Sequence, residues 1–137
     1  QQVMNSPSGR HPRIKHLGFV QVKDMPAVME QCGVFVLPSS YEPWGVVVHE
    51  HACAGFPMVL SSAVGAGDRF LTETGNGFRF ISGDAGTLSS MLRMTMLSTD
   101  AELLGMGRRS AELGAQWNPK EWALVVMDLI KTRRHEA

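Results

Sequence analysis

The sequence predicts an α/β fold in which a Rossmann-like parallel sheet is flanked by helices. Short apolar segments bounded by glycine and proline alternate with helix-like segments between residues 33 and 83. These apolar segments lack the polar alternation of half-exposed strands, so we expect both faces of the sheet to be covered. With 137 residues, the chain has the ordinary length of one domain.

The N-terminal part predicts a polar leader followed by a strand and a helix. Residues 1–13 contain no hydrophobic period, and we expect them to be partly disordered. A short strand is predicted at Ile14–Phe19 and a helix at Asp24–Gln31. Residues 14–137 would then form the folded domain. Because the chain does not begin with methionine, we expect it to be a fragment of a longer protein.

The central segment predicts two further strands joined by a helix. Apolar runs at Val34–Leu37 and Pro57–Ser61 have the length of buried strands, and Pro38 ends the first of them. A helix is predicted over Gly45–Ala54, and Gly55 ends it.

After these strands, a glycine-containing loop leads to a last strand and then to helices. Val64–Asp68 precedes a helical turn at Arg69–Thr72, and the turn Gly75–Gly77 precedes a strand at Phe78–Ile81. Three helices follow. They are predicted from the helical spacing of Leu88, Met91, Leu92 and Thr95, from a capping box of Thr99 with Glu102, and from an Asn118 cap before the apolar stripe Trp122, Val125, Val126, Leu129 and Ile130.

Composition excludes several classes of protein. Thirteen basic and thirteen acidic side chains leave no net charge to attract a polyanion, so we expect no nucleic-acid partner. Cys32 and Cys53 lack the spacing of a zinc site or a disulfide framework, and we expect two buried free thiols and no metal. No apolar run is long enough to span a bilayer, which favours a cytoplasmic protein and leaves membrane contact open.

Two carboxylates are the best indication of function. Glu42 lies in a loop, and Glu50 lies in a nearly apolar helix beside Val46, Val47, Cys53 and Ala54, which share its face at helical spacing. A buried carboxylate needs hydrogen-bond donors, and a vicinal diol such as ribose offers two. Two interpretations stay open, since Glu50 reaches either solvent or a polar partner. For Glu42 the alternative is that a loop carboxylate before a helix N-terminus is favourable whatever the function.

The loop before this helix lies where parallel sheets bind ligands, beyond the carboxyl end of a strand. Free amides around Trp44, Gly45 and Val46 would favour an anion such as a diphosphate, and Gly45 would allow close approach. The alternative is an ordinary strand-to-helix turn shaped by Pro43 and Gly45. Gly65 and Gly67 form a possible second loop at the same edge, or a simple connection.

Taken together, residues 18–117 resemble the C-terminal, nucleotide-sugar-binding domain of retaining GT-B glycosyltransferases. The resemblance depends on the segments LGFV, VFVLPSSYEPWG, AGFP and NGF, on Gly65, and on two glutamates, Glu42 and Glu50, separated by seven residues. The combination of these motifs is more specific than the pair of glutamates alone.

The resemblance implies a site and a reaction. Glu42 would contact hydroxyls of the transferred sugar and act as the catalytic-site carboxylate, with Pro43, Trp44, Gly45 and Val46 around the sugar and diphosphate. Glu50 would accept hydrogen bonds from the ribose. The nucleotide diphosphate sugar is the donor substrate, and no further cofactor is implied. The acceptor hydroxyl would belong to a glycan, polysaccharide or glycolipid.

The resemblance also implies partners for this chain. In the family, an N-terminal domain supplies the acceptor site, and an Arg and a Lys before this segment grip the diphosphate. Neither is present here, so the fragment alone is expected to be inactive. Three alternatives remain: a non-catalytic interaction or regulatory module on the same scaffold, a GT-B epimerase, and a dinucleotide-binding oxidoreductase, which the missing GxGxxG disfavours.

Overall fold

The computed structural model describes residues 11–121, 123–124 and 127. The chain divides into two compact units, Gln1–Cys32 and Gly33–Ala137. In the first unit, a 3-10 turn at Val22–Asp24 leads into helix α1 at Met25–Met29, so the helix predicted over Asp24–Gln31 is confirmed with shorter ends.

The strand predicted at Ile14–Phe19 is wrong. This segment has no strand conformation, and Ile14, Leu17 and Phe19 are 51%, 48% and 87% exposed. An apolar run forms a strand only where a neighbouring strand accepts its backbone hydrogen bonds. Within the described residues, the three strands of the sheet all come from the second unit.

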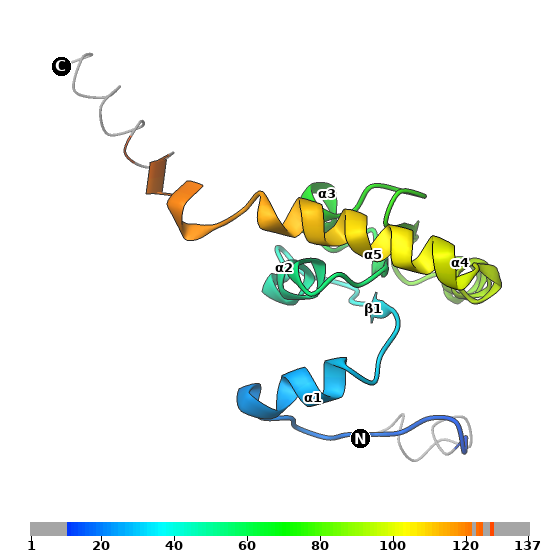
Figure 1. Ribbon diagram of the computed structural model, residues 1–137. Coiled ribbons are helices and arrows are strands. Elements are labelled where there is room, and N and C mark those ends of the chain that lie inside the picture. Colours follow the sequence, from blue (N-terminus) through cyan, green and yellow to red (C-terminus); the bar gives the residue numbers. More distant parts are fainter. Residues whose placement is uncertain (1–10, 122, 125–126, 128–137) are drawn as a thin grey trace. The chain divides into compact units, whose positions relative to one another are not determined.

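The second unit contains a parallel sheet of three strands in the order β1-β2-β3, where β1 is Phe35–Leu37, β2 is Met58–Ser61 and β3 is Gly77–Phe80 (Figure 1). Val36 lies opposite Val59 in β2, and Val59 lies opposite Phe78 in β3. The predicted parallel sheet is confirmed. The last strand begins one residue earlier than the sequence predicts.

Four helices connect and cover these strands: α2 at Val46–Cys53, α3 at Gly67–Phe70, α4 at Ala85–Leu97 and α5 at Asp100–Ala115. Helix α3 begins two residues before the predicted helical turn, so Gly67 belongs to its first turn. The Asn118 cap is confirmed, because its side-chain oxygen accepts from the amides of Lys120 and Glu121. The apolar stripe predicted beyond it falls on Trp122, Val125, Val126, Leu129 and Ile130, which lie outside the described residues.

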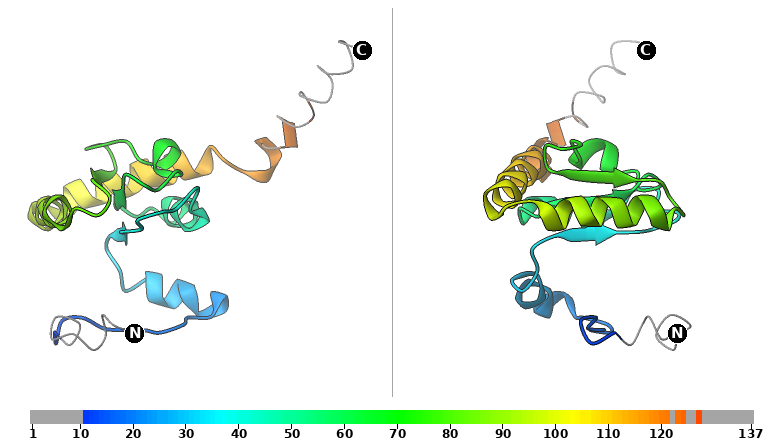
Figure 2. Two further views of the ribbon diagram at one scale, coloured as in Figure 1. Left: turned by 180° about the vertical axis from the view of Figure 1, so that it is seen from behind. Right: turned by 90° about the vertical axis from the view of Figure 1, so that its right-hand side faces the viewer.

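Both faces of the sheet are covered, as predicted. On one face, Met58 and Leu60 of β2 pack with α2 and α3 in a core of Val48, Ala52, Met58, Leu60, Val64, Ala66, Phe70 and Leu71. On the other face, Val59 and the phenylalanines of β3 pack against α4, which runs beside β3 (Figure 2). The residues of β2 alternate between the two cores, as the pleat of a strand requires.

Helix α5 packs closely on α2 because two glycines lie in the contact. A Cβ on Gly114 would lie 2.7 Å from the amide nitrogen of Cys53, and a Cβ on Gly107 would meet the carbonyl oxygen of Gly55. Gly55 itself has a φ of +78°, a left-handed conformation that favours glycine at the end of a helix. These contacts fix α2, which carries the candidate site.

The capping box predicted at the start of α5 is confirmed. The amide and the hydroxyl of Thr99 donate to the Glu102 carboxylate at 2.7 and 2.9 Å, and the Glu102 amide donates to Thr99 Oγ1 at 3.3 Å. The backbone hydrogen bond from Thr99, helped by its hydroxyl, lowers the pKa of Glu102 below its ordinary value of 4.5.

This lowered pKa gives an expected pH dependence of stability. A carboxylate whose pKa is lower in the folded state stabilises that state above the unfolded pKa, and the contribution is lost as the pH falls through the folded pKa. We expect wild type to have a higher Tm than Glu102→Gln at pH 7, and the difference to shrink below pH 4.5. Circular-dichroism melts at stepped pH measure it. A Tm difference that stays constant until the Glu102 carboxylate is fully protonated would contradict this role of Glu102.

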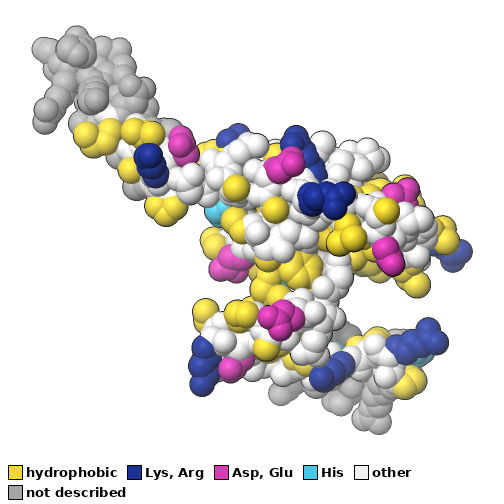
Figure 3. Space-filling view, viewed as in Figure 1, with side chains coloured by type: hydrophobic (Ala, Val, Ile, Leu, Met, Phe, Trp, Pro, Cys, Tyr) yellow, Lys and Arg dark blue, Asp and Glu magenta, His cyan; other side chains and the backbone are white. Residues whose placement is uncertain are grey.

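The surface of the second unit carries both signs of charge. In Figure 3, basic and acidic side chains are interspersed over α5. One such pair is Arg109 with Glu112, at 3.0 Å. In the described part of the chain, no helix has the length and apolar character needed to cross a bilayer.

Candidate functional site

The loops that follow β1 and β2 are joined by backbone hydrogen bonds. The Glu42 amide donates to the carbonyl oxygen of Ala63 at 3.1 Å, and the Gly65 amide donates to that of Glu42 at 3.0 Å. Glu42 and Val64 form a parallel bridge, which extends the pairing of β1 with β2 beyond the strands. The half-buried Glu42 therefore sits on a backbone that a second loop holds in place.

Gly65 allows these two loops to meet. A Cβ at this position would collide with the carbonyl oxygen of Pro43, which is backbone and cannot rotate away. The next amide, from Ala66, donates to the carbonyl oxygen of Trp44 at 2.8 Å. The structure therefore brings Gly65 against the Glu42 loop, whereas Gly67 lies buried in the first turn of α3.

Helix α2 begins with free backbone amides. Gly45, its N-cap, has φ +89° and ψ +72° and supplies no side chain to accept from the first turn. Among the described residues, the amides of Trp44 and Gly45 have no hydrogen-bond partner. The positive end of the helix dipole and unpaired N–H groups together favour an anion. A Cβ on Gly45 would lie 3.1 Å from Cγ of Glu42, so this helix start adjoins the Glu42 side chain.

The residues around this helix start are accessible. Pro43 is exposed, and Trp44 and Val46 are 47% and 64% exposed. The Trp44 ring makes an edge contact with Phe70, with centroids 6.3 Å apart. One side of the tryptophan is therefore anchored in the core, while the rest faces the solvent beside Gly45.

Of the two interpretations left open for Glu50, the structure favours exposure to solvent. Glu50 is exposed, and so are Val46 and Cys53, which lie on the same side of α2. The helix instead buries Val48 and Ala52 completely, because these residues face the core. Glu50 thus lies one turn from Val46 on an outward face, and its exposure carries no desolvation cost. Its contact with a ribose stays a prediction, now without support from burial.

The expected burial of the two cysteines is wrong. Both cysteines are free, as expected, but both are exposed instead of buried. Cys53 lies one turn after Glu50 on the outer side of α2, and Cys32 donates from its thiol to the carbonyl oxygen of Val28 at 3.3 Å.

The histidines that flank Glu50 have packing roles. His49 stacks on Phe70 with ring centroids 4.6 Å apart, and its Nε2 lies 3.0 Å from the carbonyl oxygen of Gly114. His51 stacks on Phe35 at 3.8 Å. The described residues contain no group of three potential metal ligands.

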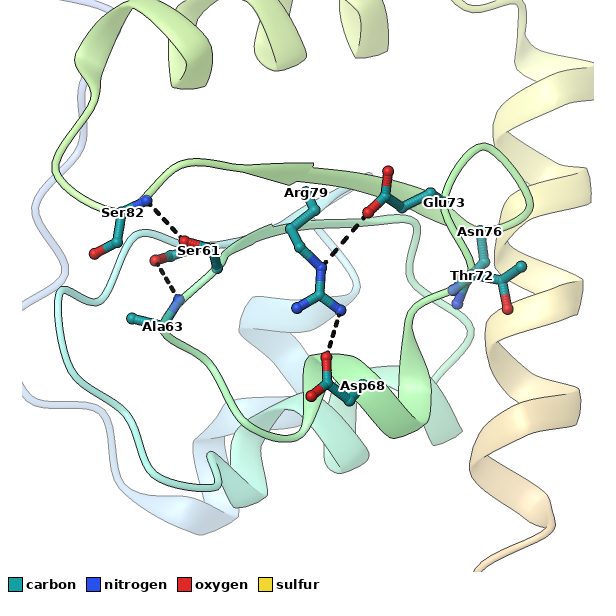
Figure 4. Close-up of polar contacts among 9 residues, drawn as sticks. Ser61, Ala63, Asp68, Thr72, Glu73, Asn76, Arg79 and Ser82 are labelled. Atoms are coloured by element: carbon teal, nitrogen blue, oxygen red, sulfur yellow. Dashed lines mark hydrogen bonds and ion pairs between the residues drawn. The ribbon is translucent and has the colours of Figure 1, made fainter.

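Sequence reasoning missed a buried polar residue at the start of β3. Asn76, which the pattern places in a simple tight turn, is fully buried. Its Oδ1 accepts from the Thr72 amide at 2.7 Å, and Figure 4 shows the two residues side by side. Its Nδ2 donates to the carbonyl oxygen of Phe70 and to Ser110 Oγ at 2.8 and 2.9 Å. It links the end of α3, the start of β3 and α5. An Asn–Gly pair usually indicates a turn, so no sequence signal pointed to this role.

An ion-pair group next to Asn76 also escaped the sequence analysis. Arg79 of β3 points toward α3, where its guanidinium lies 2.9 Å from Asp68 and 3.6 Å from Glu73 (Figure 4). The ion pairs found between described residues involve neither Glu42 nor Glu50. Both carboxylates of the candidate site are thus left without a cationic partner in the described part of the chain.

Comparison with known proteins gives consistent results. The chain is 33% identical to glycogen synthase from Mycobacterium tuberculosis over 81 residues, which cover 57% of this chain and 20% of that protein. Its fold is similar to sucrose-phosphate synthase from Thermosynechococcus elongatus, with a TM-score of 0.76, 23% identity, and coverage of 91% of this chain and 31% of that one. HepE from Anabaena, solved with UDP and glucose, has the same TM-score and identity and is covered over 34% of its length.

These similarities fix the fold and the family. The chain spans a fifth or less of the curated relatives and about a third of the solved structures. The structural likeness confirms the predicted GT-B type of fold. A family model described as Glycosyl transferases group 1 matches residues 9–103, which is more than half of the sequence and includes both loops of the candidate site. The chain therefore belongs to the family of glycosyl transferases group 1.

Proposed function

We propose that this chain is the donor-binding part of a retaining glycosyltransferase, which moves a sugar from a nucleotide diphosphate sugar to an acceptor hydroxyl. The observation that carries this proposal is the pairing of the Glu42 loop with the Gly65 loop beside the uncapped start of α2. A carboxylate and a set of free amides at one sheet edge suit a ligand that has both hydroxyls and a diphosphate.

In this proposal, each part of the site binds a different part of the donor. The amides of Trp44, Gly45 and Val46 hold the diphosphate and stabilise the negative charge that develops as the bond to the sugar breaks. Glu42 accepts hydrogen bonds from hydroxyls of the transferred sugar. Glu50, on the outward face of α2 one turn from the helix start, accepts from the ribose.

Further support comes from the relatives. The protein HepE, which has the same type of fold, was solved with UDP and glucose. The chain spans only about a third of that protein. We therefore propose catalysis for the full-length protein, in which a further domain binds the acceptor, and donor binding without transfer for this chain alone.

Calorimetric titration of the chain with UDP, GDP and ADP tests the proposal. We expect one of these nucleotides to bind, and Glu50→Gln to weaken it about tenfold to a hundredfold, the range for a hydrogen bond to a charged group. Glu112→Gln, which changes an exposed carboxylate on α5, is the matched control and should bind like wild type.

The outcomes separate the alternatives. Absence of binding by all three nucleotides would favour a non-catalytic module on the same scaffold. Binding that Glu50→Gln leaves unchanged would remove Glu50 from the site while leaving the donor-binding function in place.

A further inference from the structure

The turn after β3 is linked to the two loops of the candidate site through serines. The Ser82 amide donates to Ser62 Oγ at 3.0 Å, and Ser82 Oγ lies 3.5 Å from the carbonyl oxygen of Ser40, to which it donates. Figure 4 shows Ser82 beside Ser61, the last residue of β2, and near Ala63 in the loop that follows. Three chain segments, one after each strand, thus meet at the carboxyl edge of the sheet.

Ser62 is in the middle of this junction. Its amide donates to the carbonyl oxygen of Phe80 at 2.8 Å, while its hydroxyl accepts from Ser82. The next residue, Ala63, accepts from the Glu42 amide. The Ser62 side chain therefore links the β3 turn to the loop that holds Glu42. Ser62 is not among the residues proposed to bind the donor.

The link differs from an ordinary surface hydroxyl contact within one helix. Ser90, for example, donates to the carbonyl oxygen of Gly86 one turn earlier in α4, a local contact that joins no other segment. The Ser62 contact joins residues 20 positions apart, and Ser82 reaches Ser40 across 42 positions. Contacts of this length restrict how far the loops can separate.

We propose that Ser62 and Ser82 are positioning residues that hold the Glu42 loop in the conformation that binds the donor sugar. The proposal rests on the proposed function, since it assigns the sugar to Glu42. It assigns no contact between either serine and the ligand. Loss of the link would loosen the Glu42 and Gly65 backbone and weaken recognition of the sugar more than recognition of the nucleotide.

Amide hydrogen exchange and calorimetry on the 137-residue chain test this role. In Ser62→Ala without ligand, we expect the Glu42 and Gly65 amides to exchange about threefold to tenfold faster, as loss of one hydrogen bond allows. UDP-glucose should bind about threefold to tenfold more weakly, and UDP by less than about twofold. Ser62→Thr keeps the hydroxyl and should restore both values. Ser90→Ala is the matched control.

Two results would overturn the proposal. One is exchange at Glu42 and Gly65 in Ser62→Ala that equals exchange in Ser90→Ala. The other is an equal loss of UDP and UDP-glucose affinity. If Ser62→Ala unfolds, Ser82→Ala replaces it, because it removes the hydroxyl that donates to Ser40. Failure of wild type to bind any nucleotide would overturn the proposed function, whereas the exchange measurement needs no ligand and still decides the role of Ser62.

Discussion

Replacing Gly65 with alanine is expected to weaken donor binding strongly and to destabilise the fold. The new Cβ would collide with the carbonyl oxygen of Pro43, so the two loops would have to separate. Separation breaks the hydrogen bonds from the Gly65 and Ala66 amides to Glu42 and Trp44. Overpacking of this kind typically costs about 1–3 kcal/mol, and each broken hydrogen bond adds about 0.5–1.5 kcal/mol.

Calorimetry with UDP-glucose and urea unfolding measure the two effects of Gly65→Ala. We expect affinity to fall by more than about tenfold, the change that corresponds to 1.4 kcal/mol. Gly33→Ala is the matched control, because a Cβ at Gly33 would meet no atom within 4 Å. If Gly65→Ala binds UDP-glucose as tightly as Gly33→Ala does, the pairing of the two loops has no part in donor binding.

The position of Gly65 illustrates what the sequence could predict about the site. The glycine was recognisable as part of a second loop at the carboxyl edge of the sheet, because the apolar run before it indicates a strand. The sequence could not show that Gly65 contacts Pro43, because the contact depends on the register between β1 and β2, which no local pattern encodes. The sequence thus placed both loops at one edge and could not show that they are hydrogen-bonded.

The exposure of Glu50, which the sequence left open, and the error at Ile14–Phe19 have a related cause. Helix α2 has the sequence VVVHEHAC, which is apolar on several sides, so its period could not show which face is buried. Packing decides this, since Val48 and Ala52 face the core and Glu50 faces outward. Likewise, the apolar residues of Ile14–Phe19 indicated a strand, but pairing with a neighbour depends on other parts of the fold.

The Asn–Gly pair before β3 shows how tertiary contacts can override a turn signal. The sequence predicted a turn there, and the structure has one, but the Asn76 side chain points into the protein and binds three groups. A buried amide side chain is tolerated only where its donors and acceptor are satisfied. Here the partners come from Phe70, Thr72 and Ser110, the last of which lies 34 positions away.

Asn76→Ala is therefore expected to lower the free energy of unfolding by about 3 kcal/mol or more. The change leaves the Thr72 amide, the Phe70 carbonyl and the Ser110 hydroxyl without this partner, and an unsatisfied buried polar group costs about 1–3 kcal/mol. Urea unfolding measures the effect as a lower midpoint at an unchanged m-value.

Ser110→Ala provides the comparison that separates hydrogen bonding from loss of volume. It removes a single partner from the Asn76 side chain and creates a small cavity, so we expect a loss of about 1 kcal/mol. The double variant should lose less free energy of unfolding than the two single variants lose together, because both changes remove the same Asn76–Ser110 bond. Losses that add fully, or an Asn76→Ala cost below about 1 kcal/mol, would show that the bonds to Asn76 do not hold α3, β3 and α5 together.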